Sequence, residues 1–173
     1  MIPAEIKRRE NIAEYIIHMY QTEDLIVTYN FNLDDIVAYV IRHMTQDEEE
    51  LKSLLLWYAG IIDQMKQENL PSAGRRMTST QAIVAELSML HQNLLAEDDD
   101  YRSIFNSVKD DLDKQAVLSG GQVSDPIQLC LNAVYGKLII NLNGKSLPSE
   151  HEKLVARLGQ LLAYLTKVYH RSK

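Results

Sequence analysis

The chain has 173 residues, of which 46% are hydrophobic and 24% are charged, and its formal net charge is −6. This balance excludes an intrinsically disordered chain and predicts one folded domain over residues 1–173 that buries its own core. The acidic charge disfavours nucleic acid as a partner, because a negative surface repels phosphate backbones. Short basic patches, such as residues 7–9, fit solvated helix ends better than an anion site.

The single cysteine, Cys130, excludes an intramolecular disulfide and fits a reducing compartment. It lies in an apolar helical run, where cysteine acts as a small hydrophobe. No apolar segment follows the early charges of the N-terminal stretch, so we expect no signal peptide. The longest unbroken apolar run, residues 54–62, is too short to cross a bilayer. We therefore expect a soluble cytoplasmic protein that does not bind membranes.

Apolar residues recur at helical spacing along the chain, and no stretch alternates as a strand does. The periodicity predicts an all-α bundle of six or seven helices, in which four long helices form the frame. In chain order the predicted helices cover residues 3–29, 33–44, 46–69, 78–96, 101–114, 126–142 and 149–169. A linker is expected at residues 70–76. A mobile loop is expected around 115–125.

Capping signals mark several of these helix ends. Three read as capping boxes, in which a Ser or Thr and a Glu or Gln three residues later satisfy backbone N–H groups: Thr45 with Glu48, Thr78 with Gln81, and Ser149 with Glu152. Others are single caps: Asn32, Asp125 before Pro126, and Asn143 before Gly144.

The usual motifs of nucleotide, hydrolase, zinc and di-iron sites do not occur, so no catalytic residue, cofactor or metal is assigned. One polar pair remains on the first helix. Glu14 and His18 are four residues apart and share a face, as a supported base or metal ligand would. A metal would need a further ligand from another helix, and a surface ion pair is the simpler interpretation.

Glu23 and Asp24 interrupt the apolar stripes of the same helix. A buried acid must be paired or neutral, and Arg42 or Arg76 could pair with one of these. A structural ion pair is favoured over a catalytic acid.

The stretch Ile6 to Asn30, with its phrase ENIAEYI and Glu23-Asp24-Leu25, and the tail LVARLGQLLAYLTKVYHRSK carry a resemblance over the whole chain. The chain resembles a family of uncharacterised bacterial proteins known as a domain of unknown function. The resemblance implies a bacterial cytosolic protein and brings no catalytic residue, cofactor or partner.

The sequence thus favours a non-enzymatic helical interaction protein, with self-association as a homo-oligomer or a protein partner. Two adjoining apolar stripes on the first helix support this, since one core does not easily cover both. The first stripe comprises Ile12, Ile16, Met19 and Ile26, and the second comprises Ala13, Ile17, Tyr20 and Val27. The alternative is a ligand- or metal-binding bundle, which could be an enzyme, built on Glu14, His18 and Glu23.

Overall fold

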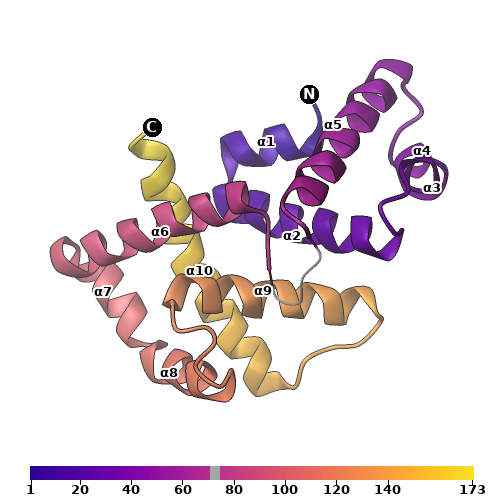
Figure 1. Cartoon of the computed structure of the whole chain (residues 1–173). Helices are drawn as coiled ribbons and strands as arrows, with labels where there is room; N and C mark the ends of the chain where they lie inside the picture. Colours follow the sequence, from indigo (N-terminus) through magenta and orange to yellow (C-terminus); the bar gives the residue numbers. More distant parts are fainter. Residues whose placement is uncertain (71–74) are drawn as a thin grey trace. The chain divides into compact units, whose positions relative to one another are not determined.

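The computed structural model describes residues 1–70 and 75–173, and within these ranges it contains helices and no strand (Figure 1). The all-α prediction is confirmed. The elements are α1 (Pro3–Glu10), α2 (Ile12–Thr28), α3 (Leu33–Ile36), η1 (Val37–Ile41), α4 (Arg42–Met44), α5 (Glu48–Gln67), α6 (Thr78–Glu97), α7 (Asp99–Asn106), α8 (Lys109–Leu118), α9 (Pro126–Leu142) and α10 (Ser149–Arg171).

The predicted number of six or seven helices is not matched, because two predicted helices are each divided. The first breaks at Asn11, where the N–H of Ile12 donates to His170 Nε2 at 3.1 Å instead of continuing the helix of α1. The fifth breaks before α8, where Val108 adopts a non-helical φ of −123° and is fully buried. The partner at the first break, His170, is distant in the sequence, and the second break coincides with a fully buried residue; periodicity reports neither.

The predicted helix 33–44 is continuous but contains a π-helical turn, η1. Ile36, directly before the turn, and Ile41, its last residue, are both fully buried. A π turn adds a residue to the helical repeat, and this one shifts the apolar face so that both isoleucines reach the core.

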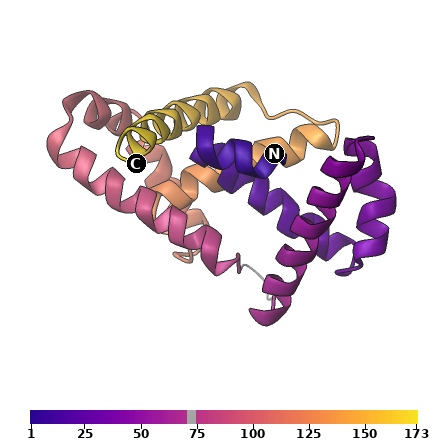
Figure 2. The ribbon, with the colours of Figure 1, turned by 90° about the horizontal axis from the view of Figure 1, so that it is seen from above.

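The chain divides into two compact units. The first comprises Met1–Glu10 and Glu14–Ala82, and in it η1 and its flanking turns lie alongside α5 (Figure 2). Its core gathers buried side chains from α1, α2, α3, η1 and α5 and from the segments next to α1, α5 and α6: Ile2, Ala4, Met19, Ile26, Ile36, Ile41, Leu54, Tyr58, Ile62, Met65, Leu70 and Met77.

The second unit comprises Asn11–Ala13 and Ile83–Lys173, and α9 packs against both α8 and α10 in it. Its most deeply buried side chains, all at most 1% exposed, include Leu87, Tyr101, Val108, Ile127, Cys130, Leu131, Leu158, Leu161 and Leu165. Ile12 and Ala13 of α2 are grouped with this unit, whereas Met19 and Ile26 belong to the core of the first. The division between the units therefore falls along the length of α2, between Ala13 and Glu14.

The single caps are confirmed. Asn32 accepts from the N–H groups of Asp34 and Asp35, and Asp125 accepts from those of Ile127 and Gln128. Gly144, at φ 71°, follows the cap residue Asn143. It takes a left-handed conformation that glycine adopts without strain.

The three capping boxes are wrong. Asp47, not Thr45, caps α5 and accepts from the Glu50 N–H at 2.8 Å. At α6 the Thr78 N–H donates to Glu68 of α5, and Ser149 lies inside α10 with no side-chain cap before it. The acceptor at α5 is the neighbouring Asp47, and the acceptor at α6 is the distant Glu68, in place of the predicted threonine hydroxyls.

The sequence predicted two connections between helices, a linker at residues 70–76 and a loop around 115–125. Within the predicted linker 70–76, residues 71–74 lie outside the described part of the chain, and Arg75 to Met77 are not helical. Residues 115–118, placed in the predicted loop, form the last turn of α8. Gly120 and Gly121 follow it with positive φ values of 68° and 76°.

Candidate functional site

The first two predicted polar residues, Glu14 and His18, have separate partners. Glu14 is exposed, and its carboxylate lies 3.2 Å from Lys7 Nζ. The half-buried ring of His18 stacks on Trp57 of α5, with centroids 5.8 Å apart and planes 21° apart. Burial, helped by Lys7, lowers the pKa of His18 below its usual value, so the neutral ring is favoured.

No group of three or more His, Cys, Asp or Glu side chains that could hold a metal occurs among residues 1–70 and 75–173. His18 and Glu14 therefore gain no third ligand from the described residues. The stacked indole of Trp57 gives His18 an aromatic neighbour, which is a packing role.

The other two predicted residues, Glu23 and Asp24, meet Arg76 at the entry to α6. Arg76 Nη1 lies 2.7 Å from Asp24 Oδ1 and 3.7 Å from Glu23 Oε2. The guanidinium also lies over the Tyr20 ring, 4.5 Å from its centroid. One of the two arginines suggested by the sequence thus joins both acids, as a structural ion pair would.

Glu23 is only 2% exposed, and its two oxygens differ. Oε2 accepts from the Met77 N–H at 3.3 Å, whereas Oε1 has no hydrogen-bond partner in the described part of the chain. Burial raises the pKa of Glu23 to about 7, although the nearby Arg76 opposes this change.

A second carboxylate, that of Glu68, accepts hydrogen bonds at the start of α6. Glu68 Oε2 accepts from the N–H and the hydroxyl of Thr78 at 2.9 and 2.8 Å. Helix starts leave N–H groups without intrahelical acceptors and favour negative charge. Glu23 of α2 and Glu68, which directly follows α5, therefore accept hydrogen bonds at the start of α6, a structural role for both side chains.

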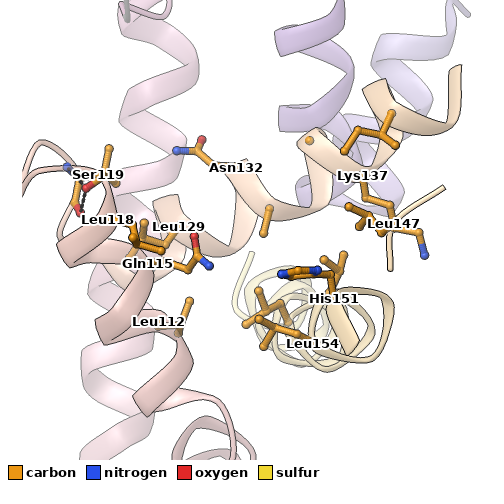
Figure 3. A pocket seen from close by; sticks show the side chains of 16 residues that line it. Leu112, Gln115, Leu118, Ser119, Leu129, Asn132, Lys137, Leu147, His151 and Leu154 are labelled. Carbon is orange, nitrogen blue, oxygen red and sulfur yellow. Dashed lines mark hydrogen bonds between the residues drawn. The ribbon is translucent and has the colours of Figure 1, made fainter. Parts of the chain in front are cut away.

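The second unit contains a cavity of about 480 Å³ between α8, α9 and α10 (Figure 3). The sequence did not predict it. Its buried floor is formed by Leu112, Leu129 and Leu158, each at most 8% exposed. Further apolar walls come from one face of α9 and one of α10: Ala133, Ile140, Leu154 and Val155.

Polar side chains lie toward the opening of this cavity. Gln115, Asn132 and His151 are exposed lining residues. The ring of His151 and the amide of Gln115 are both directed into the space between the helices (Figure 3). Lys137 also lines the cavity, and its ammonium pairs with Glu152 of α10 at 2.9 Å. The cavity therefore has an apolar floor and a polar opening.

Gly136, in the middle of α9, lines the same cavity. A Cβ added at this position would have no atom within 4 Å, so the space above the backbone is open. Glycine inside a helix costs about 1 kcal/mol relative to alanine. Packing does not require a glycine here, whereas an open cavity does benefit from one.

A polar pair, His91 and Tyr101, is buried in the second unit away from the cavity lining. His91 is 1% exposed and Tyr101 is fully buried, and His91 Nδ1 lies 2.6 Å from the Tyr101 hydroxyl. Burial lowers the pKa of His91 and raises that of Tyr101. Burial also raises the pKa of Cys130 to about 12, so this thiol remains protonated and acts as the expected small hydrophobe.

None of the described helices has both the length and the apolar character that crossing a bilayer requires. The fold and its sites define a helical protein with two compact units, the second of which contains an apolar cavity. The chain belongs to the family described as Domain of unknown function (DUF4924), whose model matches residues 1–173. Searches among curated proteins and among solved structures find no match.

Proposed function

We propose that this protein is a non-enzymatic binding protein that holds a small, largely apolar molecule in the cavity of its second unit. The cavity itself is the observation that supports the proposal. Its volume of about 480 Å³ falls within the range of ligand pockets, roughly 300 to 1,000 Å³. Its apolar floor and few polar groups at the opening are also typical of such pockets.

The arrangement gives a ligand one orientation. Leu112, Leu129 and Leu158 exclude water from the floor, so the apolar part of a ligand gains most by lying there. Gln115 and His151 are exposed residues of the lining and can form hydrogen bonds with a polar end. The proposed ligand site thus lies in the second unit, and not at Glu14, His18 and Glu23 as in the alternative drawn from the sequence.

A leucine at position 136 tests the proposal, because its side chain would occupy the cavity. We expect Gly136→Leu to weaken binding of the neutral apolar dye N-phenylnaphthylamine by about tenfold or more, measured by dye fluorescence. The matched control is Gly159→Leu in α10. Gly159 also has no atom within 4 Å of an added Cβ, but it does not line the cavity.

Dye binding that survives in Gly136→Leu would place the dye elsewhere and remove the support of the cavity. Equal losses in both variants would point to a change in stability. Thermal melting of the variants separates that outcome, because replacing a helical glycine should raise or preserve the melting temperature.

An interaction function, with self-association or a protein partner, is the second candidate. Val117 and Leu118, neighbours at the end of α8, are 77% and 78% exposed. Large apolar side chains that adjoin on a surface favour contact with another chain. Tyr20 in the second stripe of α2 is 1% exposed, so that stripe supports self-association less than the end of α8 does.

If α8 mediates self-association, replacing Val117 and Leu118 by serine should convert a dimer into a monomer in sedimentation velocity. Met89→Ser provides the control, since Met89 is also 69% exposed but lies on α6. A wild-type protein that is monomeric at all concentrations would remove the self-association proposal. We also propose a cytoplasmic location, for which the single protonated thiol of Cys130 is the support.

A further inference from the structure

We propose that the ligand of the cavity is an amphipathic monocarboxylate, with its apolar chain on the leucine floor and its carboxylate at Lys137. This inference rests on the proposed ligand-binding function and adds the chemical class of the ligand. It follows from the charge of the residues that line the cavity, and from where that charge lies.

Lys137 is the only Asp, Glu, Lys or Arg among the described residues that line the cavity. Its side chain is 30% exposed, so its charge is partly shielded from water. A cation in such a setting attracts an anion more strongly than a fully solvated lysine does. The lining therefore favours a negative group over a neutral or positive one.

The number and kind of donors favour a carboxylate over a phosphate. A lysine ammonium is a compact single charge with three N–H donors, and Glu152 Oε2 takes one of them at 2.9 Å. No arginine lines the cavity, so the planar, two-bond recognition that often binds phosphate is not offered by the described lining. The two N–H donors of Lys137 that remain suit the two oxygens of one carboxylate.

The polar neighbours extend this site. The ring of His151 is directed into the cavity between the leucines and Lys137, and it can donate a hydrogen bond to a carboxylate oxygen, whereas Gln115 lies beside Leu112 and Leu129 (Figure 3). Leu112, Leu129 and Leu158 lie on the buried side. A molecule with an acid at one end and a hydrocarbon chain at the other matches both ends of the cavity.

The test compares decanoate, decanol and decylamine, which share one chain and differ in the head group. We expect isothermal titration calorimetry of the full chain to show decanoate binding about tenfold more tightly than decanol, with decylamine the weakest. Lys137→Met keeps the aliphatic stem and removes the charge, so decanoate affinity should fall to that of decanol. Decanol affinity should not change.

Lys153→Met is the matched control. Lys153 lies on the same α10 that contributes Glu152, is 71% exposed and pairs with Glu150, but it does not line the cavity. Both substitutions lower the net charge by the same amount, so only a local effect distinguishes them. If Lys137→Met melts at a much lower temperature, Lys137→Gln replaces it.

Glu152→Gln provides an independent arm. Removing the carboxylate that competes for Lys137 should tighten decanoate binding severalfold and leave decanol unchanged. Equal affinities for decanoate and decanol in the wild type, or tightest binding of decylamine, would overturn the carboxylate assignment and leave the ligand cavity intact. Failure of all three probes, together with N-phenylnaphthylamine, would overturn the cavity proposal itself.

Discussion

Replacing Glu23 by glutamine is expected to stabilise the first unit by about 2 to 3 kcal/mol above pH 7. The same substitution should remove a fall in stability that the wild type shows as the pH rises from about 4.5 to about 7. The reason is that Glu23 is 2% exposed and its Oε1 has no hydrogen-bond partner among the described residues. A charged carboxylate in that position loses hydration that it does not fully recover.

The direction in which stability changes with pH follows from the number of protons that unfolding binds or releases. The folded pKa of Glu23, about 7, lies above the ordinary value of 4.5 that applies in the unfolded chain. Between these values the folded carboxyl holds a proton that unfolding releases. The stabilisation from Glu23 is therefore complete below pH 4.5 and is lost as the pH rises through about 7.

The charged groups around Glu23 limit the size of the effect. Arg76 favours its ionised form, whereas Asp24 and Glu68 disfavour it. Glutamine can still accept from the Met77 N–H through its amide oxygen, so the cap on α6 is preserved. The substitution should thus remove the cost of the buried charge and keep the hydrogen bond.

Urea unfolding followed by Trp57 fluorescence measures this effect, because the only tryptophan lies in the first unit with Glu23. Asp24→Asn is the control: its side chain is 51% exposed, so its substitution should change stability by at most about 1 kcal/mol. Wild-type and Glu23→Gln curves that run parallel across this pH range would show that Glu23 is ionised in the fold and that its capping role dominates.

Sequence patterns predicted those features of the fold that depend on local geometry. Asn32 and Asp125 cap helices whose N–H groups lie two and three residues away, so composition was sufficient. Thr78 was misassigned because its N–H is taken by Glu68 of another helix. The break at Asn11 depends in the same way on His170, which is 158 positions from Ile12.

The cavity could not be predicted for a related reason. The helical spacing of residues 126–142 predicts an apolar face through Ile127, Leu131, Val134, Leu138 and Leu142. Ile127 and Leu131 are fully buried, whereas Leu142 is 66% exposed. The cavity uses a neighbouring face with Gly136 and Lys137. A mid-helix glycine was the signal available in the sequence, but a space between three helices depends on their packing.

The buried pair of His91 and Tyr101 is expected to give the second large effect. Tyr101→Phe would leave His91 Nδ1 without its partner at 2.6 Å, inside a core where His91 Nε2 already has none among the described residues. Leaving a buried polar group unpaired costs about 1 to 3 kcal/mol. We therefore expect Tyr101→Phe to destabilise the second unit by about 2 kcal/mol, measured by guanidinium unfolding and circular dichroism.

The double variant distinguishes a polar interaction from simple packing. His91→Phe should be destabilising because it leaves the Tyr101 hydroxyl buried and unpaired. The new ring can keep the contact with Phe105, whose centroid lies 4.7 Å from that of His91 in the wild type. With both residues changed to phenylalanine, no orphaned group remains. The double variant should therefore be more stable than the sum of the single changes predicts, by about 1 to 2 kcal/mol. Additive losses would instead show that His91 and Tyr101 contribute through volume alone, and that the hydrogen bond between them adds no net stability.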